Sequence, residues 1–280
     1  MKSRVLRLLA VIGLLLIVIP AQAAVECWVT SGGFNVAYDP ALAGVTTAQS
    51  SVVVSCTRSD PSSDPTTVNY AIKANNGLYA NGVNNRAQSG TAYAKYDVYM
   101  GTGCGTQWKG NATFSGTINF AVSSMATHTF SGCVGARQNS LPAGTYWDQV
   151  TMTMDYGPNP QSSAAGMFAV NIVTQGQCSF SSPPGTLSFS YISFQTTAAN
   201  VSAFFGVTCT SGLPYTLTLD TTTGTIAGLN YSLGLSGAAG TGTGVQQSLS
   251  VDGSMPAGQS GTCAMGTCSG TNPHTLTITY

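Results

Sequence analysis

Much of the chain alternates between apolar and polar residues. Residues 68–72, 150–156 and 215–219 are clear examples. Alternation with period two, many Thr, Val and Tyr residues, and Gly or Asn between short runs are typical of β-strands and turns. No stretch beyond residue 23 sustains a helical period. Several short antiparallel strands, each with one buried face, predict an all-β protein built as a β-sandwich.

The N-terminal residues follow a different pattern. Three basic residues precede an unbroken apolar run over residues 8–20, and the small-x-small triplet Ala21-Gln22-Ala23 follows it. This pattern predicts a secretory signal peptide that is cleaved after Ala23. A membrane anchor is the alternative, but the apolar run is short for a bilayer span. The mature protein is therefore expected outside the cytoplasm.

The rest of the chain contains a repeat. Each half has a Val-x-Cys-Thr segment, at residues 54–57 and 207–210, and later a Pro-Ala-Gly triplet. Each half also contains a strand-like run that ends in Tyr, at Tyr156 and Tyr280. Because these features recur in the same order in both halves, the sequence predicts two tandem immunoglobulin-like or pilin-like β-sandwich domains. The predicted division is a signal peptide over 1–23, an N-terminal domain over 24–157, a Pro-, Ser- and Gly-rich linker over 158–166 and a C-terminal domain over 167–280.

Eight cysteines fall four in each half, which in an exported chain predicts disulfides. The repeat favours pairing Cys27 with Cys56 and Cys178 with Cys209, at similar separations. The remaining pairs would be Cys104 with Cys133 and Cys263 with Cys268. Because four cysteines allow three pairings, the connectivity stays open at this point. A zinc site is disfavoured, because both His residues lie in strand-like segments away from any Cys-x2-Cys pair.

Charge excludes several classes of function. Only 6% of residues are charged, and the mature chain keeps six basic residues against nine acidic ones. It therefore has no basic face for nucleic acid. No nucleophile elbow and no pair of glutamates is present, so neither an enzyme nor a cofactor is expected. A surface with so few charges is poorly protected against association, which indicates a subunit covered by partners.

One strand-like segment has no counterpart in the other half. Phe168, Val170 and Ile172 alternate with smaller or polar residues before Cys178, whereas the mature chain has only three residues before Cys27. Residues 167–174 could be the first strand of the second domain. They could instead be a donor strand, which fills the open groove of another β-module. The pattern alone leaves both interpretations open.

Several motifs together resemble the spore coat protein U family, whose domain is also the subunit of archaic (Csu-type) chaperone–usher pili. The motifs are the residues 34–40 after the first Cys, the two Val-x-Cys-Thr segments, residues 141–146 and the last strand over 276–280. The second half departs from the pattern, because it lacks a Tyr-Asp-Pro turn and inserts a small Cys loop within 258–272.

The resemblance implies a pilin-like sandwich that lacks its seventh strand. A periplasmic chaperone would hold such a subunit, an outer-membrane usher would export it, and a neighbouring pilin subunit would complete it. A two-domain member without a donor strand ahead of its first Cys looks like a tip adhesin that attaches to surfaces and supports biofilm formation. Phe168, Val170 and Ile172 would then complement the first domain within the same chain. The alternatives are a secreted spore-coat or matrix protein and an ordinary shaft pilin.

The first half also has longer Gly- and Asn-rich inserts. Loops at the ends of a sandwich commonly carry binding residues, and exposed apolar side chains there would contact a surface or receptor. The candidate adhesive residues are Leu78, Tyr79, Val83, Met100, Trp108, Phe120 and Met125.

Overall fold

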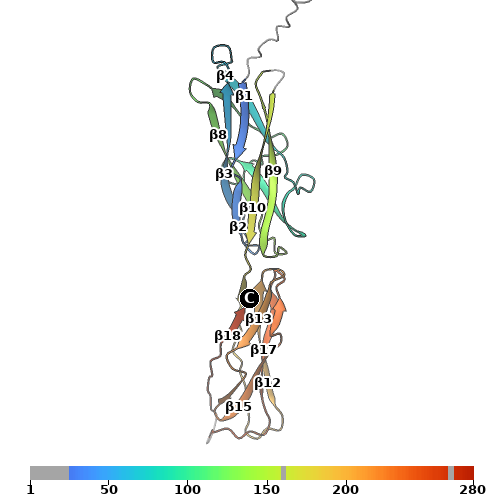
Figure 1. Cartoon of the computed structure of the whole chain (residues 1–280). Coiled ribbons are helices and arrows are strands. Elements are labelled where there is room, and N and C mark those ends of the chain that lie inside the picture. The colour runs from blue at the N-terminus through green and yellow to red at the C-terminus, as the bar shows by residue number, and fades with distance from the viewer. Residues whose placement is uncertain (1–24, 159–161, 264–267) are drawn as a thin grey trace, which may run out of the picture.

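The computed structural model describes residues 25–158, 162–263 and 268–280. The predicted signal peptide lies outside the described residues. Figure 1 shows two β-modules arranged end to end along one axis, which we call the first module (residues 25–174) and the second module (residues 178–280). The described residues contain no helix, and so none that could cross a membrane. The predicted all-β fold with two disulfide-stapled repeats is confirmed.

The first module is one curled sheet in which the strands follow the order β1-β3-β8-β6-β5-β9-β10-β2, with β4 paired to β7 and β9. Strand β1, at one end of this order, lies against β10, the last strand but one at the other end, since a Cβ atom at Gly166 on β10 would collide with the Val29 carbonyl on β1. The sheet thus closes around one apolar core. The strands are β1 (Val25–Ser31), β2 (Phe34–Tyr38), β3 (Thr46–Arg58), β4 (Thr67–Ala74), β5 (Asn85–Ser89), β6 (Ala92–Met100), β7 (Phe114–Asn119), β8 (Met125–Val134), β9 (Gly144–Tyr156) and β10 (Ser162–Thr174).

The second module has two separate sheets among its described residues. One has the order β11-β12-β17-β15-β14 and the other the order β16-β13-β18. Its apolar core is distinct from that of the first module. The strands are β11 (Cys178–Ser182), β12 (Ala199–Cys209), β13 (Pro214–Leu219), β14 (Thr223–Ile226), β15 (Leu229–Leu235), β16 (Ala239–Thr241), β17 (Gln247–Met255) and β18 (Leu276–Thr279).

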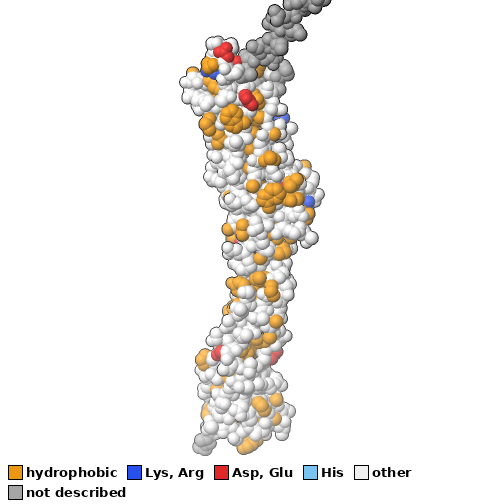
Figure 2. Space-filling model, in the orientation of Figure 1, with side chains coloured by type: hydrophobic (Ala, Val, Ile, Leu, Met, Phe, Trp, Pro, Cys, Tyr) orange, Lys and Arg blue, Asp and Glu red, His pale blue; other side chains and the backbone are white. Residues whose placement is uncertain are grey.

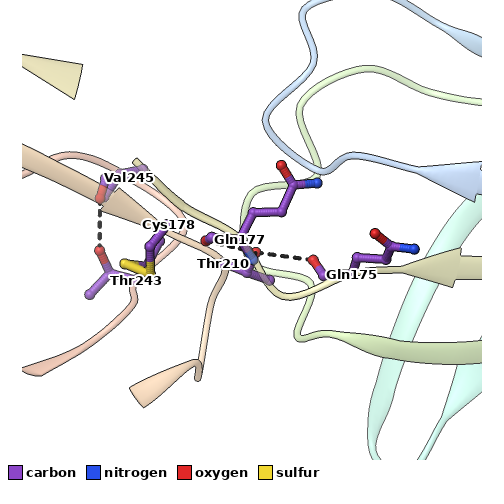
Figure 3. Close-up of a disulfide and its surroundings, with 7 residues drawn as sticks. Gln175, Gln177, Cys178, Thr210, Thr243 and Val245 are labelled. Carbon is purple, nitrogen blue, oxygen red and sulfur yellow. Dashed lines mark hydrogen bonds between the residues drawn. A yellow bond between two sulfur atoms is a disulfide. The ribbon is translucent and has the colours of Figure 1, made fainter. Parts of the chain in front are cut away.

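The boundary between the modules differs from the predicted one. Residues 162–166 were expected in the linker and 167–174 in the second domain, but all of them belong to β10 and pair with β9. The connector is instead the short segment from Gln175 to Gln177. Thr210 holds it, because its hydroxyl accepts a hydrogen bond from the Gln177 amide at 3.0 Å and donates one to the Gln175 carbonyl at 3.3 Å (Figure 3).

Four disulfides join the cysteines: Cys27–Cys56 and Cys178–Cys209, the pairs that the repeat favours, and Cys104–Cys133 and Cys263–Cys268, the pairs that remained. Cys27 faces Cys56 across β1 and β3, and Cys178 faces Cys209 across β11 and β12. The first strand of each module is therefore linked by a disulfide to the strand paired with it, β3 in the first module and β12 in the second.

Candidate functional site: a filled groove and an open groove

Strand β10 fills a groove in the first module. It runs antiparallel to β9 along its whole length and parallel to β2 from Val170 to Thr174. Its side chains alternate, so Phe168, Val170 and Ile172 point inward and are at most 3% exposed. Strand β2 has no other strand partner in the part of the chain that is described, and β10 is what joins it to the sheet.

The largest inward side chain of β10 meets an aromatic cluster. The ring of Phe168 lies with its centroid 4.9 Å from that of Phe130 and is stacked 6.2 Å from Trp108. Trp108 is 1% exposed, and its Nε1 donates to the Ile72 carbonyl at 3.3 Å. The prediction of Trp108 as an adhesive loop residue is therefore wrong. Its loop folds back so that the indole packs beneath β10, where burial of a large aromatic surface is favourable.

A buried carboxylate lies beside the same groove. Asp148 on β9 is fully buried, faces Val170 across the strand pair, and accepts hydrogen bonds from the Tyr96 hydroxyl at 2.6 Å and the Leu78 amide at 2.8 Å. Burial, and then the nearby Asp148 charge, raise the pKa of Tyr96, so its hydroxyl stays protonated and continues to donate. A Cβ atom at Gly77 would collide with this carboxylate. Asp148 thus fixes the start of the β4–β5 loop.

The second module contains an equivalent frame, as a repeated hydrogen-bond latch shows. In the first module, the Tyr38 hydroxyl donates to the Gly135 carbonyl at 2.7 Å and accepts from the Gln138 amide at 3.2 Å. In the second, the Tyr191 hydroxyl donates to the Pro256 carbonyl at 2.7 Å and accepts from the Gln259 amide at 3.0 Å.

Each latch glutamine also bonds the backbone of one residue in the neighbouring hairpin. Gln138 bonds both backbone groups of Lys95, and Gln259 bonds both of Asn230. The latch therefore places residues 187–191 where β2 lies in the first module. The apolar–polar alternation of residues 187–191 was the sequence signal that could have revealed this correspondence to β2.

A second set of contacts aligns the last strands. The ring of Tyr70 packs over Gly116 and that of Tyr215 over Gly240, at matching positions of β4 and β13. The Tyr96 hydroxyl donates to Asp148 in the first module, whereas the Asn272 amide donates to the Tyr231 hydroxyl in the second. These pairs make β18 the counterpart of the end of β9. They also place His274 where the first module has Val150.

No strand fills the matching groove in the described part of the second module. Strand β18 pairs only with β13, and residues 187–191 form no strand. Between them lies a groove of about 580 Å³. Its apolar lining is Leu187, Phe189, Tyr191, Leu219, Ile226, Leu229, Tyr231, Leu233, Val251, Met255 and Leu276.

His274 places an imidazole in the wall of this groove. Its Nε2 is 2.7 Å from the Tyr231 hydroxyl, and its Nδ1 is 3.0 Å from an Asp220 carboxylate oxygen. The hydrogen bond to His274 is the largest of the effects that lower the pKa of Asp220. Both ring nitrogens are thus engaged, and the imidazole is held at the groove wall. The described residues hold no cluster of three metal-ligating side chains.

Comparison with known proteins identifies the repeated unit. The family model of the Spore Coat Protein U domain matches residues 14–153 and 164–278. The chain belongs to the Spore Coat Protein U domain family. A comparison with curated proteins found no match.

This Spore Coat Protein U protein also resembles solved structures. A chain of the CsuC–CsuE chaperone–tip adhesion subunit pre-assembly complex from the archaic chaperone-usher Csu pili of Acinetobacter baumannii is 14% identical, with a TM-score of 0.50. The match covers 91% of this chain and 99% of that one. The CupB6 tip adhesin from Pseudomonas aeruginosa is 9% identical with a TM-score of 0.43, and the match covers 92% and 95% of the two chains. At 14% identity the likeness to the Acinetobacter baumannii chain shows the fold alone.

The other predicted loop residues of this family member lie at two separate places. Leu78 and Val83 are 61% and 68% exposed on the β4–β5 loop, and Tyr79 between them contacts the ring of Trp147. Met125 is 53% exposed at the start of β8, near the opposite end of β4. The eight residues of β4 separate the two places by about 25 Å.

Two predicted residues are only partly exposed. Met100 and Phe120 pack against the core, and the guanidinium of Arg58 covers the Phe120 ring at 4.8 Å. Sequence reasoning missed Trp147 and Tyr93, which are exposed on regular strands rather than on loops. Figure 2 shows apolar side chains scattered over a surface with few charges.

Proposed function

We propose that this protein is the tip adhesin of a chaperone–usher pilus, assembled by donor-strand complementation. The observation that carries the proposal is the contrast between a first module filled by its own β10 and a second module with an open groove. Such a chain can receive a strand at one end and present a closed module at the other. The complex of the fold relative from Acinetobacter baumannii, a chaperone with a tip adhesion subunit, supports this assignment.

The open groove also indicates the partners. Exposed backbone groups at a strand edge and uncovered apolar side chains favour aggregation, so we expect a periplasmic chaperone to cover them first. An outer-membrane usher would then pass the subunit on, and a strand of the neighbouring pilin subunit would enter the groove. Export would depend on the predicted signal peptide, and the product would lie on the cell surface.

The contact with a surface or receptor is assigned to the exposed loops of the first module. Leu78, Val83 and Met125 are the leading candidates, with Tyr79, Met100 and Phe120 beside them. Replacing Leu78 and Val83 with Asp should abolish attachment and biofilm formation while pili still assemble. Loss of the pili themselves would assign these residues to folding instead.

Immunogold labelling tests the position in the fibre. A single particle at a fibre end is the expected result. Labelling along the fibre would show an ordinary shaft pilin, and an even coat without fibres would show a secreted spore-coat or matrix protein. Either result would overturn the proposal.

A further inference from the structure

The outer face of the first module carries a row of aromatic and amide side chains across three strands. Trp147 on β9 is paired with Gln88 on β5, and Gln88 is paired with Tyr93 on β6. Paired residues project from the same face of a sheet, so the three side chains form one row about 10 Å long. Trp147 and Tyr93 are 38% and 37% exposed, and Tyr79 extends the row from the β4–β5 loop.

Two cations lie directly opposite each other next to this row. Arg86 on β5 is paired with Lys95 on β6. Like charges at such positions are destabilising. Neither side chain forms an ion pair in the described residues, although Lys73 and Lys109 both do. The acid on the same face of β6, Asp97, is engaged by Lys109 at 2.7 Å.

The arginine is held in place by neutral groups. Its guanidinium carbon lies 4.2 Å from the centre of the Tyr93 ring, and its Nε donates to the Tyr79 carbonyl at 3.1 Å. The Gln88 amide donates to the Tyr93 hydroxyl at 3.3 Å. A guanidinium that is held over an aromatic ring and has no carboxylate partner can bind an anionic group of a ligand.

The second module gives an internal comparison. The latch aligns Lys95 with Asn230, and Asn230 is paired with Thr225. These two side chains are neutral and bond each other at 3.0 Å. At this position of the repeat, the second module therefore has a neutral pair whose side chains bond each other. The first module has two cations without a carboxylate partner. The fold does not require cations there.

We propose that this face binds an acidic saccharide. The apolar CH faces of pyranose rings would lie on the exposed ring of Trp147 and on the partly buried ring of Tyr79 beside it, and a sugar carboxylate would bind Arg86 and Lys95. Arginine suits a carboxylate because its planar guanidinium can donate two parallel hydrogen bonds. Because the row is longer than one sugar ring, the ligand contains at least two. A nucleic acid fits poorly, since Arg86 and Lys95 are the only cations placed in this row.

Isothermal titration calorimetry of the full mature chain with hexagalacturonate tests the proposal, with maltohexaose as the neutral ligand. We expect saturable binding of hexagalacturonate alone. Arg86→Gln, Lys95→Gln and Trp147→Ala should each weaken it by about tenfold or more. The matched controls are Arg58→Gln, which removes another arginine stacked on a ring, and Trp28→Ala, which removes another exposed indole. Both controls should bind as the unchanged protein does.

Three results would overturn the proposal. They are no binding of hexagalacturonate, equal binding of maltohexaose, and equal losses in the site and control variants. Circular dichroism of each variant separates a lost contact from a lost fold. Because Lys95→Gln alters an exposed side chain, this variant should fold and still tests the proposal if Trp147→Ala does not fold. The calorimetry measures binding to the isolated chain, so its result does not depend on where the subunit lies in a fibre.

Discussion

The two modules share a frame but differ in how completely their cores are covered. Among the described residues, the core of the first module has 30 buried apolar residues and seven that are partly buried. The core of the second has nine buried and thirteen partly buried. The latch, the first disulfide and the tyrosine packed over glycine occur in both modules. The difference at the groove is one strand, and it shows that β10 contributes much of what makes the first module a closed domain.

Breaking the filled groove should have the largest effect. Phe168→Asp together with Ile172→Asp places two charges in a core where even truncation of a Phe costs about 3–5 kcal/mol. Total domain stability is about 5–15 kcal/mol, so the first module should unfold. The measurement is its thermal transition by calorimetry.

The matched control lies on the same strand. Met167 and Val173 are 59% and 37% exposed on the outward face of β10. Replacing both with Asp should change stability by less than about 1 kcal/mol. An unchanged transition in the Phe168 and Ile172 variant would show that β10 does not complete the first module.

Filling the open groove should have the opposite effect on the second module. A copy of residues 157–174 appended after Tyr280 repeats the hairpin from β9 to β10 at the aligned position. Each apolar side chain that it buries contributes about 1.5–3 kcal/mol. The thermal midpoint of the second module should rise by about 10 °C or more. A copy with Phe168, Val170 and Ile172 replaced by Ser is the control. An equal rise with that copy would contradict groove filling.

Removing the latch should have a smaller effect that differs between the modules. Tyr38→Phe and Tyr191→Phe each remove the two hydrogen bonds of the latch hydroxyl, worth about 0.5–1.5 kcal/mol apiece. Strand β2 keeps its pairing with β10, whereas residues 187–191 have no strand partner. Hydrogen–deuterium exchange should therefore increase at 187–191 in Tyr191→Phe and change little at β2 in Tyr38→Phe. Gln49→Ala, at an exposed site on β3, should change neither segment. Equal increases in both modules would show that β10 does not hold β2.

The smallest expected effect is a pH dependence of the first module. Burial lowers the pKa of His128, whose Nε2 lies 2.8 Å from the Tyr70 hydroxyl. The unfolded chain, with a pKa of about 6.5, then binds the proton more readily than the folded chain. Stability from this group is present above about pH 6.5 and is lost as pH falls below it. Denaturation midpoints of the first module should decline from about pH 8 to about pH 5.5, and less in His128→Gln. Equal declines would assign the effect to other groups.

Several features of this protein follow from the sequence alone. Alternation identified strands, because burial of one sheet face selects every second residue. The order of cysteines and of Pro-Ala-Gly revealed two repeats. The sequence also predicted that Phe168, Val170 and Ile172 share one apolar face, since alternation defines the face of a strand but not the residues that pack against it.

Only the tertiary structure decided which groove that face fills. Strand pairing joins residues far apart in the chain, so a strand between two modules can belong to either by pattern alone. The same limit explains Trp108, whose loop composition predicted exposure while the fold turned its indole inward against Phe168. It also explains Trp147 and Tyr93, which became neighbours of two cations only because β9, β5 and β6 lie side by side.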